Sequence, residues 1–159
     1  MEALVRWQHP EHGLIPPDEF IPLAERTGLI TPLTHYVLDE ALRQCRQWRN
    51  AGHELSVAVN VSARRLLDLQ FPGEVSELLA RHQVPAQLLV VELTESTIMV
   101  DPVHALEVLS RLNTMGVQLS IDDFGTGYSS TAYLKNLPVH ELRWTDPSSP
   151  RCFATPTTP

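Results

Sequence analysis

Three apolar segments of β type, spaced about one βαβ unit apart, limit the folds open to this chain more than any other feature. They are "LSVAV", "LLVVEL" and "VQLSI", which start near residues 55, 88 and 117. Strands this apolar are typical of a sheet buried on both faces, and helical crossovers between strands make neighbouring strands parallel. We therefore predict an α/β fold with a parallel sheet, and we expect a further strand near residue 141.

The segments before and between these strands carry helical periodicity and helix end signals. "DEFIPLAERTG" predicts a first helix that ends at Gly28, and a third helix is expected near "GEVSELLARH". Asp101 and Pro102 have the residue types of an N-cap and first helical position, and Gly116 would close that helix. The second helix, ahead of the first strand, should pack by one apolar face that contains Leu33, Val37, Ala41, Cys45 and Trp48.

Charge and composition narrow the class of partner. The net charge of -7 on 159 residues argues against a nucleic-acid polymer or an anionic membrane surface. No apolar run reaches the roughly 18 residues that span a bilayer. Cys45 and Cys152 lie in unlike contexts and give neither a disulfide framework nor a metal-binding spacing. We expect a cytoplasmic chain whose partner is a small molecule or a protein.

Polar residues recur where the predicted strands end. Asn60, Glu92, Asp122 and Asp123 each lie at or near the carboxyl end of a strand, the edge at which parallel sheets and barrels build their sites. Asn and Asp after a strand also form Asx turns, so a purely local role stays open for each single residue. As a set, the carboxylates and the amide oxygen suit Mg²⁺ or Mn²⁺ better than zinc. The pattern indicates a hydrolase site that uses a divalent metal.

Four motifs in this order carry a resemblance to a known family: "EALVRW" at 2–7, "NVS" at 60–62, "ELTES" at 92–96 and "DDFGTGYSS" at 122–130. Together they resemble the EAL domain family, bacterial phosphodiesterases that hydrolyse cyclic di-GMP to linear pGpG. The resemblance implies a TIM-like (β/α) barrel. Such a barrel needs about 250 residues, so we expect these residues to form a partial barrel that lacks the first strand and the last units.

The resemblance also implies roles for individual residues. Glu2, Asp122 and Asp123 would be catalytic, with Asp122 bridging two metals, while Arg6 would hold a substrate phosphate. Glu95 would anchor the loop at 124–130, through which the family forms homodimers. The ligands of the two Mg²⁺ or Mn²⁺ ions would be Glu2, Asn60, Glu92, Asp122 and Asp123.

The end of the chain departs from the family pattern. Arg143 stands where the family has a catalytic lysine, in a strand of the form Lys-Val-Asp-Arg-Ser-Phe-Val. If that strand is encoded by AAG, GTG, GAC, CGA, TCC, TTC and GTC, loss of one A from the AAG lysine codon gives Arg-Trp-Thr-Asp-Pro-Ser-Ser, the sequence at 143–149. We therefore expect a partial EAL domain at 1–143 and an out-of-frame, disordered tail at 144–159. The alternative is a natural tail rich in Pro, Ser and Thr. Sequencing the gene beyond codon 143 separates the two.

These expectations lead to one functional hypothesis and two alternatives. By ancestry the chain is a cyclic di-GMP phosphodiesterase, but without the lysine strand we expect no appreciable hydrolysis. Open sheet edges predict poor solubility. The first alternative is a degenerate module that binds cyclic di-GMP or a protein partner without cleavage. The second is a non-functional frameshifted product.

Overall fold

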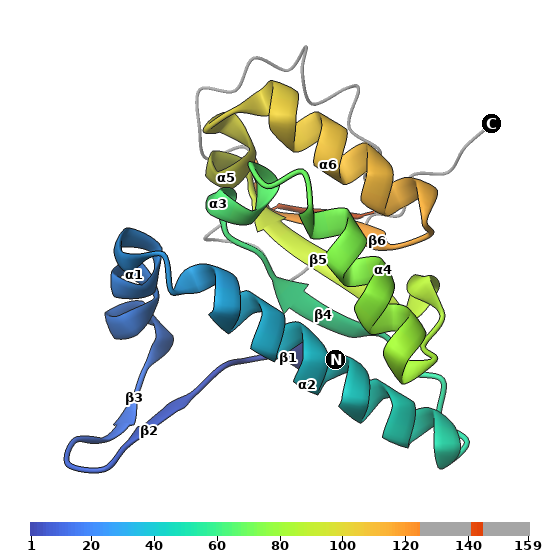
Figure 1. Ribbon diagram of the computed structural model, residues 1–159, viewed down its shortest axis with the longest axis horizontal. Helices are drawn as coiled ribbons and strands as arrows, with labels where there is room; N and C mark the ends of the chain where they lie inside the picture. The colour runs from blue at the N-terminus through green and yellow to red at the C-terminus, as the bar shows by residue number, and fades with distance from the viewer. Residues whose placement is uncertain (125–140, 145–159) are drawn as a thin grey trace.

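The computed structural model describes residues 1–124 and 141–144, and a five-stranded parallel sheet forms its centre (Figure 1). The sheet has the order β1-β4-β5-β6-β7, which is also the order of these strands along the chain. Every connection therefore steps in the same direction, as in a barrel, and not in two directions from a central strand. The strands are β1 (Glu2–Ala3), β4 (Val57–Asn60), β5 (Leu89–Thr94), β6 (Gln118–Phe124) and β7 (Glu141–Trp144).

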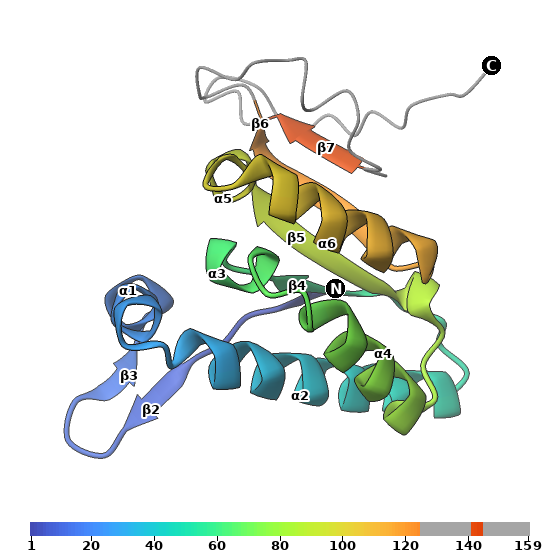
Figure 2. The same ribbon diagram turned by 45° about the horizontal axis from the view of Figure 1, so that its top comes forward.

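Three long helices cover one face of this sheet. Figures 1 and 2 show α2, α4 and α6 side by side across that face, while α1 lies beyond the end of α2 next to a small antiparallel hairpin. The hairpin is β2 (Trp7–His9) and β3 (Gly13–Ile15). The helices are α1 (Pro17–Thr27), α2 (Ile30–Asn50), α3 (Ala63–Leu66), α4 (Phe71–His82), η1 (Ala86–Leu88), α5 (Glu95–Met99) and α6 (Pro102–Thr114).

The predicted helix ends are confirmed. Gly28 follows α1 in the left-handed conformation, with φ of 82°. Asp101 caps α6 by accepting a hydrogen bond from the backbone N–H of His104 at 3.2 Å. Gly116, with φ of 91°, ends the turn after α6. The strand expected near residue 141 is β7, which pairs parallel to β6.

The core lies between the sheet and the helices. Alternate strand residues, such as Val59 and Val91, belong to the same buried cluster as Leu38 and Leu42 of α2. The predicted face of α2 is only partly correct, because Leu33 and Val37 are half-buried. The helix packs against α4 as well as against β4, which rotates its most buried stripe toward Leu38 and Leu42.

Several predictions lie outside the described residues. These are the loop at 125–130, the dimer proposed to form through it, and the tail from residue 145 onward. Among the described helices, none combines the length and the apolar character needed to cross a bilayer.

Candidate functional site

Four of the predicted site residues lie on one face of the sheet, one on each of four adjacent strands. Asn60 of β4 pairs in register with Glu92 of β5. Glu2 pairs with Ala58, two residues before Asn60, and Asp122 lies two residues after Ser120, the partner of Glu92. Register partners, and residues two apart on a strand, point to the same face. The shared face therefore carries Glu2, Asn60, Glu92 and Asp122.

The alternation of each strand explains why these polar side chains share a face. In "VAVN", Val57 and Val59 belong to the core, so Ala58 and Asn60 point the other way. In β5, Glu92 lies between Val91 and Leu93, which are both core residues. The apolar residues that fix each strand on the helices thus turn the polar ones to the opposite face.

The two sides of this site differ in exposure. Asn60 donates a hydrogen bond from Nδ2 to Oε1 of Glu2 at 2.9 Å, and both residues are exposed. Glu92 is only 1% exposed, and Asp122 is intermediate. The hydrogen-bonded pair of Asn60 and Glu2 thus faces solvent, whereas the carboxylate of Glu92 on the next strand is buried.

The chemistry of this donor set fits a hard divalent cation. Carboxylate and amide oxygens are the ligands that Mg²⁺ and Mn²⁺ prefer. Within residues 1–124 and 141–144, no three His, Cys, Asp or Glu side chains are already gathered as a metal cluster. Asp123 belongs to β6, but its side chain is outside the described part. Among the described side chains, Glu2, Asn60, Glu92 and Asp122 therefore supply oxygen donors on one face of the sheet.

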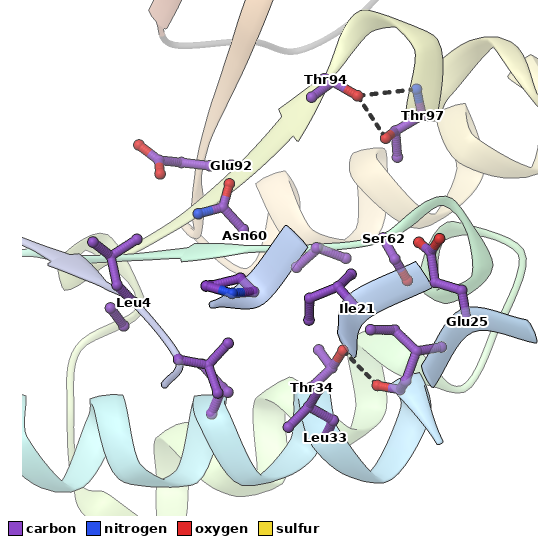
Figure 3. A pocket seen from close by; sticks show the side chains of 16 residues that line it. Leu4, Ile21, Glu25, Leu33, Thr34, Asn60, Ser62, Glu92, Thr94 and Thr97 are labelled. Carbon is purple, nitrogen blue, oxygen red and sulfur yellow. Dashed lines mark hydrogen bonds between the residues drawn. The ribbon is translucent and has the colours of Figure 1, made fainter. Parts of the chain in front are cut away.

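A pocket of about 280 Å³ opens beside Asn60 and Glu92, between α1, α2 and the ends of β4 and β5. Figure 3 shows Ile21 and Glu25 on one wall, with Asn60, Ser62 and Glu92 on the strand side. The α1 wall was not predicted from the sequence. Its residues are distant from the strand-end motifs along the chain, and the apolar pattern of α1 indicated only a packed helix.

Arg6 lies in a neighbouring groove and not in this pocket. That groove, of about 440 Å³, runs along β1 and α2 and also contains Glu2. Arg6 is exposed, and its Nη1 donates to the backbone oxygen of Val5 at 2.9 Å. The structure therefore brings Arg6 to the groove of Glu2 but does not bring it into the pocket of Asn60 and Glu92.

Glu95 and Arg143 complete the predicted set. Glu95 is 4% exposed and begins α5 directly after Thr94, whose hydroxyl accepts from the backbone N–H of Thr97 at 3.3 Å. Its predicted partner loop is outside the described residues. Arg143 lies in β7 next to Leu142, which pairs with Ile121, and nothing is described of its side chain.

Comparison with known proteins identifies the source of this arrangement. Residues 1–145 match the EAL domain family. The chain is 51% identical over 144 residues to the bifunctional diguanylate cyclase/cyclic di-GMP phosphodiesterase MucR of Pseudomonas aeruginosa, a match covering 90% of this chain and 21% of MucR. It is 43% identical over 143 residues to the cyclic di-GMP phosphodiesterase PdeR of Escherichia coli, covering 90% of this chain and 22% of PdeR.

A solved structure is similar to this chain in fold as well as in sequence. The structure described as the PaMucR phosphodiesterase in complex with c-di-GMP superposes with a TM-score of 0.84 at 51% identity. The match covers 89% of this chain and 57% of that one. The chain thus spans about a fifth of the length of the curated relatives and a little over half of the solved domain.

Proposed function

Because this chain belongs to the EAL domain family, we propose that the sheet face bearing Glu2, Asn60, Glu92 and Asp122 binds divalent metal and cyclic di-GMP. The reaction class of such a site is hydrolysis of one phosphodiester bond to give linear pGpG. The named activity of MucR and PdeR, and the c-di-GMP complex of PaMucR, support this choice of ligand.

The observation that carries the proposal is the register of four adjacent strands. It places one oxygen-bearing side chain from each strand on a common face, with Asn60 and Glu2 in direct contact at 2.9 Å. A phosphodiester is anionic and resists attack by water. Acidic side chains alone would repel it, so a carboxylate-rich face suits this ligand only together with cations.

The proposed roles follow from donor chemistry and position. Glu2, Asn60, Glu92, Asp122 and Asp123 would hold two Mg²⁺ or Mn²⁺ ions. Such ions would screen the charge of the phosphodiester and would make a bound water more acidic. Asn60 orients Glu2 through their hydrogen bond. Arg6, in the groove of Glu2, is suited to a charge-assisted contact with a phosphate oxygen. Glu95 would fix the loop that follows β6.

The arginine at position 143 is the reason to expect that this chain binds cyclic di-GMP without hydrolysing it. It occupies the strand position at which the resemblance places a catalytic lysine. An arginine stays protonated and spreads its charge over a planar fork, so it does not replace a lysine that must present one compact ammonium group. We therefore propose that the chain binds cyclic di-GMP and does not cleave it at an appreciable rate.

Two measurements on the 159-residue chain test these proposals. Titration calorimetry with cyclic di-GMP in Ca²⁺ should give saturable heat, and Glu2→Gln should weaken binding by at least about tenfold because it removes a charge that a cation requires. Incubation with cyclic di-GMP and Mn²⁺, followed by chromatography, should yield no pGpG.

A matched control is Glu54→Gln, which removes an exposed carboxylate ahead of β4, at the end of the strand opposite Asn60. Its affinity should equal that of the unsubstituted chain. If both substitutions weakened binding equally, the proposal that the binding site lies on this face of the sheet would be wrong. Formation of pGpG that is lost in Glu2→Ala would show that the chain is an active phosphodiesterase.

A further inference from the structure

We propose that Arg64 is a positioning residue that holds α1 against the carboxyl end of β4 and so keeps the pocket shaped for cyclic di-GMP. This proposal rests on the function proposed above. It concerns a residue outside the four motifs, on a short helix that follows Asn60.

Helix α1 packs mainly on α2 and on the hairpin, away from the strands of the sheet. It lies beyond the end of α2, and of its residues only Phe20 and Ala24 are buried (Figure 1). Phe20 meets the edge of Trp7 from the hairpin at 5.8 Å between ring centroids. These contacts join α1 to the hairpin and to α2. Neither attaches it to the strands that carry Asn60 and Glu92.

Arg64 supplies the connection to the strand side. Its Nη1 donates to the backbone oxygen of Glu25 at 2.7 Å, across 39 positions of sequence. Glu25 lies in the last turn of α1, at the negative end of the helix dipole, and its carbonyl accepts a long hydrogen bond of 3.4 Å from the backbone N–H of Gly28. The guanidinium gives this carbonyl a second, shorter hydrogen bond and complements the dipole.

Gly28 lies beside this contact. Its φ of 82° ends α1, and a Cβ atom at this position would lie 3.8 Å from Nη2 of Arg64, which is ordinary van der Waals distance. The guanidinium therefore packs over the turn between α1 and α2. The backbone N–H of Gly28 and Nη1 of Arg64 both donate to the carbonyl of Glu25, at 3.4 and 2.7 Å.

The contact links two walls of one pocket. Glu25 and Ile21 line it from α1, and Asn60 and Ser62 line it from the segment that leads into α3 (Figure 3). Arg64 follows Ser62 by two residues. A shift of α1 away from α3 would widen the pocket without displacing Glu2, Asn60 or Glu92 on the sheet. Loss of Arg64 should therefore weaken the binding of cyclic di-GMP and leave the binding of the metal ion unchanged.

The test compares Arg64→Gln with the unsubstituted chain. A lost charge-assisted hydrogen bond should raise the Kd for cyclic di-GMP in Ca²⁺ about tenfold, while the Kd for Mn²⁺ alone stays within error. Arg64→Lys keeps the positive charge and should recover part of the affinity. Hydrogen exchange should accelerate across residues 17–27 in Arg64→Gln and stay unchanged across residues 102–114.

Arg26→Gln is the matched control, since it removes an exposed arginine from the last turn of α1 itself. It should change neither Kd. Unchanged exchange across α1 in Arg64→Gln would overturn the link between α3 and α1. Equal affinities of Arg64→Gln and the unsubstituted chain would overturn only the role of Arg64, whereas the absence of saturable heat from the unsubstituted chain would overturn the proposed function itself.

Discussion

Two adjacent arginines show how differently the fold uses one residue type. Arg64 is exposed, while Arg65 is fully buried, with 0% of its side chain accessible. Arg65 pairs with Asp68 at 2.8 Å and with Glu74, and its guanidinium lies 4.5 Å from the centroid of the Phe71 ring. Nothing in the sequence "ARRL" distinguishes the two arginines. Which of them becomes buried depends on how α3 packs on α4, which follows later in the chain.

Arg65→Ala should therefore destabilise the protein by about 2–3 kcal/mol, measured by urea unfolding. The substitution removes buried packing and leaves two carboxylates without their cation. The cost stays below that of a fully buried pair because Asp68 and Glu74 are each about one-third exposed.

Arg43→Ala is the control for that measurement. Arg43 also contacts a carboxylate, that of Glu40, at 2.7 Å, but both side chains are exposed. Water screens the pair, so the urea midpoint should not move measurably. Equal midpoints for the Arg65 and Arg43 variants would contradict a structural role for the buried ion pairs.

Gly116 and Gly73 should respond to alanine in opposite directions. Gly116 has φ of 91°, and a Cβ there would lie 3.1 Å from Nε2 of Gln87, so Gly116→Ala should cost about 1 kcal/mol or more. Gly73 lies inside α4 with no atom near an added Cβ, so Gly73→Ala should gain about 0.5–1 kcal/mol of unfolding free energy. Thermal unfolding of the two variants checks both signs, and a stabilised Gly116→Ala would count against the described turn.

At the scale of elements, polar contacts fasten the end of α4 to α2. Asp39 accepts from His82 Nε2 at 2.9 Å and from Arg81 at 3.3 Å. Arg49 donates to the backbone oxygen of Gln83, the residue after α4, at 2.7 Å. The Arg49 contact satisfies the carbonyl of the residue that follows α4, and together the contacts hold the end of the helix on its neighbour. They join segments more than 30 positions apart, so helical periodicity alone did not reveal them.

This link should make stability depend on pH in a defined direction. The hydrogen bond from His82, aided by the charges of His82 and Arg81, holds the pKa of Asp39 below its usual value of 3.8. A carboxyl whose pKa is lower in the folded state stabilises the fold above its unfolded pKa, and this contribution is lost as the pH falls through the folded pKa.

Asp39→Asn should therefore be less stable than the unsubstituted chain at pH 6, and the difference should shrink below about pH 4. Urea unfolding at pH 6, 4 and 3 measures it. A difference that grows on acidification would contradict the direction of the pKa change.

At the scale of the whole molecule, the sequence predicted the parallel sheet and the strand-end residues better than the pocket. Periodicity fixed the positions of β4, β5 and β6, and the polar residue after each apolar run pointed to the site. Each of these signals is local. The α1 wall, with Ile21 and Glu25, depends on a helix packed against a strand end that lies more than 30 residues later. No local pattern encodes that contact, so only the assembled fold reveals it.

The sheet also ends in an open edge within the described part of the chain. There β1 is hydrogen-bonded to β4 alone, and Leu4, which follows β1, is 55% exposed. Unpaired strand edges promote association between chains. Sedimentation velocity should show self-association that rises with concentration and is reduced in Leu4→Lys. Leu55→Lys, at the opposite end of β4, is the control. A chain that stays monomeric at all concentrations would show that this edge is protected.

The one-directional strand order has a consequence for synthesis on the ribosome. Val57 pairs with Leu89 and Val90 pairs with Gln118, so each of these strands meets a partner made one unit earlier. Glu2, by contrast, cannot pair with Ala58 until the hairpin and the two helices between them have been made. Contacts that close long loops form late. The segment that carries Glu2 and Arg6 therefore leaves the ribosome before β4, and it must remain unpaired until β4 has emerged.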